Sequence, residues 1–323
     1  NAGHPLPNQN SLKAGKKLMR FLNQTHENDF IIFLISGGGS ALAVLPDSIS
    51  LQEKIMVNEK LIRSGANINE ISCIRKHLSL IKGGRLIRDM NCNGISFLVS
   101  DVIGDDIGSI SSGISSYDKT SYKDALKIIK KYSLQNKLPK TALFVLNSGL
   151  SGKISETPKK SKIKNIIILK NSMCVFGMKE KSKDLGYKTR VIPNITGDVN
   201  QIANRLATTA LDKNTNCIIF GGEPTVKLIG TGKGGRNQEL VLRLYEKLKN
   251  KNNNYIIASM GTDGIDGNTK FAGAIFSTNS KHETKTYLKN NDSFSFFKKF
   301  GGLIYTGITQ NNVNDIGVIV KRN

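Results

Sequence analysis

The stretch FIIFLISGGGSAL, residues 30–42, decides the fold class. The apolar run Phe30–Ile35 fits a buried strand of a parallel sheet and is far too short to cross a bilayer. Three consecutive glycines follow this run, and we expect a helix after them. A strand, a glycine turn and a helix in this order form the repeating unit of α/β proteins.

The same alternation continues along the chain. We expect further helices at 11–23, 51–64, 69–80, 122–132, 173–185, 199–211 and 238–248. We expect further strands at 95–100, 166–169, 188–192, 217–220, 225–229 and 255–259. This order predicts an α/β architecture with a largely parallel sheet. The lysine-rich segment 151–165 predicts a boundary between a first domain, 1–155, and a C-terminal region, 156–323.

The composition indicates a globular protein with small anionic substrates. The formal net charge is +22, but the lysines are spread along the whole chain together with asparagine and isoleucine. No aromatic RNA-binding motif and no zinc-finger spacing accompanies them, so we expect neither nucleic acid nor a membrane as a partner. The four cysteines form no C-x-x-C pair, which argues against a zinc site and a disulfide framework and favours a reducing cytoplasm.

The glycine turn after the first strand is a candidate anion site. Backbone N–H groups in such a turn can face a ligand, and two serine hydroxyls flank it. The site would consist of Ser36, Gly37, Gly38, Gly39 and Ser40. A strand-to-helix turn without a ligand is the alternative, although three glycines are costly in backbone entropy. No G-K-[ST] follows, so the turn is not a Walker A motif.

Residues 72–86, SCIRKHLSLIKGGRL, carry four cations around a Gly-Gly turn. Arg75, Ser79 and Lys82 can share one face of a helix and there bind a carboxylate or phosphate group. A solvated basic helix is the alternative.

Two acidic loops follow predicted strands. Asp101 in SDVIGDD lies at the carboxyl end of a strand, where ligands of α/β sheets bind, and it could hold Mg²⁺. Asp263 and Asp266 in GTDGIDG could ligate a metal ion or accept a proton. Caps of the following turns are the alternative roles.

The stretch GTGKGGRNQE, residues 230–239, has the G-x-G-x-x-G spacing of a dinucleotide site. Such a site needs an acid about 20 residues further on to bind the ribose. Glu246 lies inside a predicted helix and Asp263 lies too far along the chain. Lys233, Arg236 and Asn237 instead suit concentrated negative charge, such as a phosphoryl group in transfer.

Nine motifs occur in an order that resembles a known family: GHPLPN, ISGGGSAL, RKHLSLIKGGRL, SDVIGDD, GGEPTV, GKGGRNQEL, GTDGIDG, AGA and TGITQNNVND. Together they closely resemble the MOFRL-type glycerate 2-kinases, formerly described as hydroxypyruvate reductases. The resemblance covers essentially the whole chain. It implies a Rossmann-like domain, a MOFRL domain at about 215–323, and an active site in the cleft between them. It also implies transfer of the γ-phosphoryl group of ATP to the 2-hydroxyl group of D-glycerate, with Mg²⁺ or another divalent cation.

The resemblance also implies roles for individual residues. Ser36–Ser40, Lys233 and Asn237 would bind the cofactor, and Arg75 and Lys76 would hold the anionic end of the substrate. Arg236 would lie at the transferring phosphate, while Asp263 or Asp266 would take the proton of the 2-hydroxyl group. Asp101 and Asp263 would hold the metal ion. The sequence leaves open whether the protein forms a homodimer.

Three departures from the family pattern are present. The family has an upstream strand, loop and helix with a G-K-A type motif, and we expect that segment to be missing because the chain opens at NAGHP. Ile114 replaces the usual proline after S-G, and TGITQNN at 306–312 lacks a proline and a glycine. An NAD(P)H-dependent hydroxypyruvate reductase and an inactive fragment that only binds its ligand remain the alternatives.

Overall fold

The computed structural model describes residues 2–322. The chain forms two compact units that divide between Ile168 and Leu169. This division lies later than the boundary expected at 155/156, because strand β3 (Lys164–Leu169) joins the sheet of the first unit. Each unit has its own sheet and its own hydrophobic cores.

The first unit contains a three-stranded sheet of order β1-β2-β3. Strands β1 (Phe30–Ile35) and β2 (Asn93–Val99) are parallel, with Phe30 opposite Asn93. One face of β1 packs against the core through Ile31, Phe33 and Ile35. The other face is exposed, with Leu34 79% accessible, so β1 is not the fully buried strand that its apolar run predicts.

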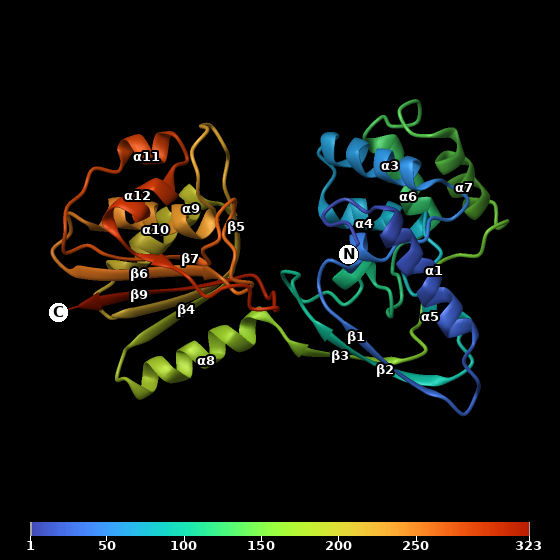
Figure 1. The fold of residues 1–323 in the computed structure, drawn as a ribbon, viewed down its shortest axis with the longest axis horizontal. Coiled ribbons are helices and arrows are strands. Elements are labelled where there is room, and N and C mark those ends of the chain that lie inside the picture. The colour runs from blue at the N-terminus through green and yellow to red at the C-terminus, as the bar shows by residue number, and fades with distance from the viewer. Residues whose placement is uncertain (1, 323) are drawn as a thin grey trace. The chain divides into compact units, whose positions relative to one another are not determined.

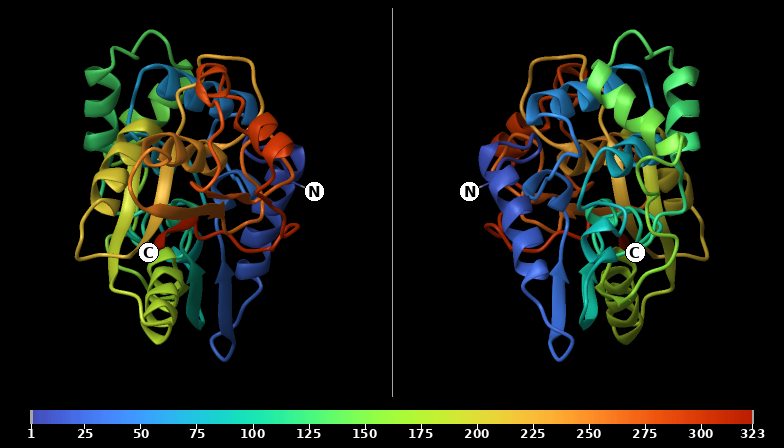
Figure 2. Two further views of the ribbon diagram at one scale, coloured as in Figure 1. Left: turned by 90° about the vertical axis from the view of Figure 1, so that its left-hand side faces the viewer. Right: turned by 90° about the vertical axis from the view of Figure 1, so that its right-hand side faces the viewer.

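Helices make up most of the first unit. They are α1 (Gln9–Asn23), α2 (Gly39–Leu42), α3 (Leu51–Arg63), α4 (Ile68–His77), α5 (Arg85–Arg88), η1 (Ile110–Ser112), α6 (Tyr122–Lys131) and α7 (Lys140–Leu150). Helices α3, α4 and α6 each begin with a reciprocal capping box, for example Ser50 with Glu53. Helices α3, α4, α6 and α7 lie together at one end of the unit and the strands at the other (Figures 1 and 2).

The second unit contains a six-stranded sheet of order β4-β5-β9-β6-β7-β8. Its strands are β4 (Thr189–Asp198), β5 (Cys217–Thr225), β6 (Asn254–Gly261), β7 (Gly273–Ser277), β8 (Leu303–Ile304) and β9 (Asp315–Arg322). Strands β4 and β5 are parallel, whereas β9 lies antiparallel between β5 and β6. The α/β class is confirmed, but this sheet is mixed rather than largely parallel.

Helices cover both faces of the second sheet (Figure 1). They are α8 (Asn171–Asp184), α9 (Val199–Ala210), α10 (Arg236–Leu248), α11 (Lys285–Lys289) and α12 (Ser293–Phe300). Ile218 and Phe220 of β5 join the core of α9, α10 and α12, while Cys217 and Ile219 join the core on the α8 side. This alternation is the period of two that a strand buried on both faces must show.

Residues 225–229, TVKLI, do not form the strand that their composition predicts. Strand β5 ends at Thr225, and the chain then leaves the sheet. The side chains of Leu228 and Ile229 are 76% and 67% exposed. Neither neighbour of β5 pairs with the segment beyond Thr225, because the pairing with β4 ends at Thr225 and the pairing with β9 ends at Gly222.

Within residues 2–322, no helix is long and apolar enough to cross a membrane. All four cysteines, Cys73, Cys92, Cys174 and Cys217, carry free thiols.

Replacing Phe296 with alanine should destabilise the second unit by about 3–5 kcal/mol, because it removes a fully buried ring from the core. Phe296 contacts the rings of Tyr245, Phe276 and Phe297. The free energy of unfolding in urea measures the effect. Phe176→Ala is the matched control, since Phe176 is 61% exposed and its removal should cost far less. Equal losses in the two variants would contradict this account of the core.

Candidate functional site

The glycine turn between β1 and α2 has the geometry of an anion-binding loop. Gly38 has a left-handed backbone with φ of 78°, which favours glycine. A side chain at Gly37 would collide with the carboxylate of Asp101, and one at Gly39 would collide with the hydroxyl of Ser111. Among the described residues, the N–H groups of Gly37, Gly38 and Gly39 donate no hydrogen bond. These donors are therefore available to a ligand.

A second segment, Ser109–Ser112, holds this loop in place. The Ser111 hydroxyl donates to the carbonyl oxygen of Ser36 at 2.8 Å, and the hydroxyls of Ser40 and Ser112 share a hydrogen bond of 2.6 Å. Ser111 and Ser112 have positive φ values of 50° and 60°, a strained conformation that persists only where the surroundings enforce it. Sequence analysis missed both serines, because their role depends on this contact and not on a motif.

Lys82 lies beneath the loop and is 2% exposed. Its ammonium group donates to the carbonyl oxygens of Gly39 at 2.7 Å and Ser111 at 3.1 Å. Burial, together with the nearby charges of Lys54 and Arg75, lowers the pKa of Lys82 to about 7. Lys82 thus joins the two segments and adds positive charge below the glycine turn.

A cavity of about 160 Å³ lies against the loop. Gly38, Ser40, Ser72, Arg75 and Asp101 are among the residues that line it. The structure therefore brings together three segments that the sequence singled out: the glycine turn, the basic segment 72–86 and the acidic loop SDVIGDD. All three belong to the first unit.

Arg75 and Lys76 are adjacent in sequence but differ in availability. Arg75 donates from Nε to the side-chain oxygen of Asn58 at 2.9 Å, and its two terminal nitrogens form no hydrogen bond among residues 2–322. Burial lowers the pKa of Arg75. Lys76 is 6% exposed and forms an ion pair of 3.3 Å with Asp118. Arg75 can bind an anion in the cavity, whereas the charge of Lys76 is already paired.

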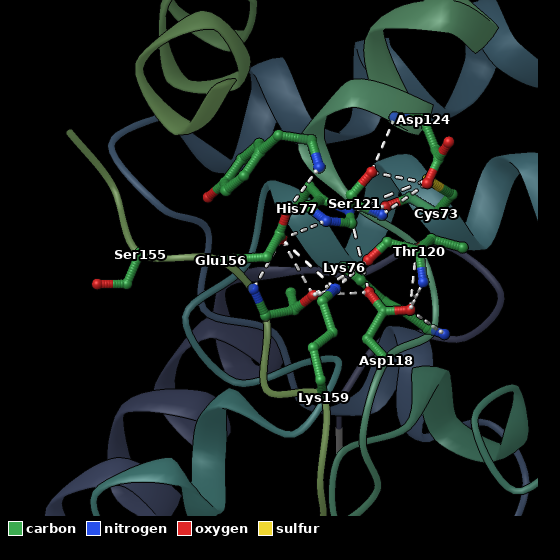
Figure 3. Close-up of polar contacts among 12 residues, drawn as sticks. Cys73, Lys76, His77, Asp118, Thr120, Ser121, Asp124, Ser155, Glu156 and Lys159 are labelled. Atoms are coloured by element: carbon green, nitrogen blue, oxygen red, sulfur yellow. Dashed lines mark hydrogen bonds and ion pairs between the residues drawn. The ribbon is translucent and has the colours of Figure 1, made fainter. Parts of the chain in front are cut away.

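The network around Lys76 is structural (Figure 3). Asp118 also accepts hydrogen bonds from Thr120 and Thr157. Burial raises the pKa of Asp118, but Lys76 and the bonds from Thr120 outweigh burial and lower it. His77 contacts Glu156 at 2.9 Å and the backbone of Cys73 at 2.8 Å. These contacts join α4 to the segments before α6 and after α7.

In the second unit, Arg236 begins helix α10 and is held by two carboxylates. It donates to both oxygens of Asp315, at 2.6 and 3.1 Å, and to Glu223 at 2.8 Å. Burial raises the pKa of Asp315 to about 6, against the opposing effect of Arg236, so Asp315 is ionised at neutral pH. Sequence analysis did not single out Glu223 or Asp315, although both lie in the quoted motifs GGEPTV and TGITQNNVND.

Asp266 and Asn237 lie in the interior, each 1% exposed. The carboxylate of Asp266 accepts the backbone N–H groups of Asn237 and Gln238, at 3.0 and 2.8 Å, and so caps helix α10. The Asn237 amide oxygen accepts a bond of 2.6 Å from Ser259. Asp266 therefore has the contacts of a helix cap and Asn237 those of a buried anchor. Their expected roles as catalytic base and cofactor ligand stay predictions.

Asp263 and Lys233 remain accessible. Asp263 is half-buried, and one of its oxygens accepts the N–H of Ile265 at 3.0 Å. Its second oxygen has no hydrogen-bond partner among residues 2–322. Lys233 is exposed and forms no ion pair within the same range. No group of three His, Cys, Asp or Glu side chains that could hold a metal ion occurs in the described part of the chain.

Most backbone donors of the second glycine loop are used within the protein. Five successive N–H groups, those of 230–234, donate to acceptors of Asn268, Asn290, Asn291 and Asp292 at 2.9–3.1 Å. Asp266 accepts the N–H groups of Asn237 and Gln238. Among the described residues, only the N–H groups of Gly235 and Arg236 in this stretch lack an acceptor, so the loop presents few donors to a pyrophosphate.

The fold and the cavity define a two-unit α/β protein with a cavity beside a glycine turn, where Arg75 and backbone N–H groups suit a small anion. Residues 1–147 match a domain of unknown function, DUF4147, and residues 216–315 match the MOFRL family. Together with the relatives described next, these matches show that the chain belongs to the glycerate 2-kinase family.

Similar proteins match nearly the whole chain. A glycerate 2-kinase of Pyrococcus horikoshii is 35% identical over 99% of this chain and 77% of its own length. A D-glycerate 2-kinase of Thermotoga maritima is 36% identical, over 99% of this chain and 79% of the relative. The crystal structure of a Thermotoga maritima glycerate kinase superposes with a TM-score of 0.89 at 34% identity, covering 99% of this chain and 80% of that one.

The buried lysine beneath the loop should make stability rise with pH. Because the folded-state pKa of Lys82 is about 7 and its ordinary value is 10.5, the unfolded chain binds a proton between these values that the folded chain does not. The free energy of unfolding should therefore increase by about 2 kcal/mol between pH 7 and pH 9 through Lys82, and Lys54, with its pKa lowered to about 8, should add a smaller increase over the same interval. Urea unfolding at the two pH values measures it.

The variant Lys82→Met should lose most of this rise, while the exposed Lys130→Met should keep it. The same pH dependence in both variants would show that Lys82 is not the group responsible.

Proposed function

We propose that this chain transfers the γ-phosphoryl group of ATP to the 2-hydroxyl group of D-glycerate, forming 2-phosphoglycerate. Membership of the glycerate 2-kinase family supports the activity. The observation that carries the proposal is the cavity at the first glycine turn, which combines open N–H donors with Arg75 and a buried lysine. Phosphoryl transfer depends mainly on positioning and on neutralising negative charge, and these groups supply both.

We assign the turn Ser36–Ser40 to binding phosphate oxygens through its backbone donors. Arg236 would neutralise charge on the transferring group, and Glu223 and Asp315 hold its side chain in one orientation. Asp263 would orient the 2-hydroxyl group and take its proton through the oxygen that lacks a partner among the described residues. Lys233, which is exposed, would add positive charge for the nucleotide.

The carboxylates of this chain suit a divalent cation that is also coordinated by phosphate oxygens and water. Mg²⁺ in kinases is held by one or two carboxylates together with phosphate oxygens and water, so it needs no cluster of protein ligands. Asp101 lines the cavity beside Gly38 and Ser40, and Asp263 has an available oxygen. We assign Asp101 in the first unit and Asp263 in the second as carboxylates that would each be suited to hold Mg²⁺, which would neutralise phosphate charge when bound.

The alternative function, reduction of hydroxypyruvate by a nicotinamide cofactor, has less support. It would require the second glycine loop to present N–H donors to a pyrophosphate group. The side chains of Asn290, Asn291 and Asp292 already accept those donors.

Conversion of D-glycerate with ATP and Mg²⁺ should yield a product that enolase accepts directly, so that coupling through enolase and pyruvate kinase reports 2-phosphoglycerate. Controls without ATP and with L-glycerate test the dependence on the nucleotide and on stereochemistry. Consumption of NADH with hydroxypyruvate, in the absence of any ATP-dependent product, would refute the kinase proposal in favour of the reductase.

Replacing Arg236 with alanine should lower kcat by about 10²–10³-fold, as is typical when one positioned donor to developing charge is removed. The coupled assay measures the effect, and circular dichroism checks that the variant is folded. Arg205→Ala is the control, because Arg205 is exposed on α9 and should be dispensable. Normal turnover in a folded Arg236→Ala variant would remove Arg236 from the mechanism.

A further inference from the structure

Three cations of the first unit lie close together, and none has an ion-pair partner among residues 2–322. Lys54 is 7% exposed, Lys82 is 2% exposed, and Arg75 is half-buried. Burial lowers the pKa of Lys54 to about 8, with a further contribution from Arg75. Buried charges are normally paired, because a charge removed from water without a partner is costly. Arg75 lines the cavity, and Lys54 and Lys82 are near enough to Arg75 for their charges to interact. An anion bound in the cavity beside Arg75 would therefore offset the like charges.

The helix α4 presents two groups to this cavity. Ser72 and Arg75 are three residues apart and both line it. The Ser72 hydroxyl is buried and has no hydrogen-bond partner in the described part of the chain, which is uncommon in folded proteins. Asn58 fixes the Arg75 guanidinium through Nε and leaves both terminal nitrogens for a two-point contact.

Helix α3 supplies the support for this arrangement. Lys54 and Asn58 are four residues apart on α3, so both lie on the same side of the helix. Asn58 contacts Arg75, and Lys54 is near enough to Arg75 for their charges to interact. The one acid that lines the cavity, Asp101, leaves the balance of Lys54, Arg75, Lys82 and Asp101 positive.

The cavity has room for a small acid and shares Ser72 and Ser109 with a larger cavity of about 770 Å³. About 160 Å³ corresponds to roughly five water molecules. This volume suits an acid of three carbon atoms, whereas drug-sized ligands occupy cavities of about 300–1,000 Å³.

We propose that Ser72 and Arg75 bind the carboxylate group of a three-carbon hydroxy acid in this cavity, and that Lys54 and Lys82 are positioning residues that raise the positive potential around it. This inference rests on the proposed function, since it names the carboxylate subsite of the same substrate. Lys76 takes no part, because Asp118 neutralises it.

If Lys54 serves binding rather than folding, replacing it should change stability and binding in opposite directions. Lys54→Met removes one of three like charges and adds an apolar side chain of similar length, so the folded chain should become more stable. The same change should weaken binding of the acid. A lysine with a purely structural role would show the opposite effect on stability.

Isothermal titration of the full chain with D-glycerate, without nucleotide, tests the proposal. Lys54→Met and Ser72→Ala should each raise the Kd about tenfold or more, which corresponds to about 1.4 kcal/mol. In steady-state kinetics the KM for D-glycerate should rise while the KM for ATP stays unchanged. Lys54→Met should also raise the Tm, and Lys54→Arg should retain binding. Lys130→Met, on the exposed face of α6, should match the wild type.

Glycerol serves as the neutral probe, since it keeps the hydroxyl groups and lacks the carboxylate. The wild type should prefer D-glycerate, and Lys54→Met should lose most of that preference. An unchanged Kd for D-glycerate in folded Lys54→Met and Ser72→Ala would overturn the inference, and so would a loss confined to ATP. If Lys54→Met lowers the Tm and Lys54→Arg does not restore binding, Lys54 has a structural role, and this result would also overturn the inference.

The two proposals fail in different ways. A wild type that binds D-glycerate through these residues but forms no 2-phosphoglycerate would overturn the proposed function and support the carboxylate subsite. Normal turnover in the wild type that the Lys54→Met and Ser72→Ala changes leave unaltered would support the proposed function and overturn the proposed carboxylate subsite.

Discussion

The ammonium group of Lys82 lies in the interior of the first unit, and its hydrogen-bond partners are the backbone carbonyl oxygens of Gly39 and Ser111. A charged donor between two carbonyl groups fixes the distance between the segments that carry them. The glycine turn and the strained serines therefore keep one arrangement relative to each other. The shape of the cavity beside the turn depends on that arrangement, while Asn58 fixes the guanidinium group of Arg75.

The two glycine-rich turns have similar glycine spacing, but their backbone N–H groups differ in their hydrogen-bond partners. The turn at 36–40 keeps its backbone donors open, and cations surround it. The turn at 230–235 gives its donors to asparagine and aspartate side chains from the connection between α11 and α12 and from the loop after β6. Glycine spacing alone predicts that the backbone is free to approach a ligand. Whether it does so depends on residues that are distant in sequence.

Local patterns account for much of the fold. The apolar runs at β1, β2, β5 and β6 predict strands, because a run of this length between turn residues needs burial on a sheet. The pattern fails for TVKLI, because the strands that flank β5 do not pair with it beyond Thr225. It also did not identify β9, whose place between β5 and β6 is set by pairing across about 60 residues or more of chain.

The candidate site, like the fold, is only partly predictable from sequence. Three consecutive glycines and the basic segment identify the turn and Arg75 from sequence alone. The position of Asp266 after a strand could not reveal that its carboxylate caps a helix that begins 30 residues earlier. Likewise, Ser72 and Lys54 have ordinary helical surroundings in sequence, and only burial without a partner distinguishes them.

The cap at helix α10 limits how this chain could be redesigned. The carboxylate of Asp266 occupies the place at a helix start that a bound phosphate takes in dinucleotide-binding proteins. Adding a ribose-binding acid downstream would therefore not convert the loop at 230–235 into a nicotinamide site, because the protein's own anion already fills it. Removing Asp266 would open the position but would leave the first turn of the helix without its cap. In this chain, access of a phosphate to the start of α10 and the stability of that helix are coupled through one side chain.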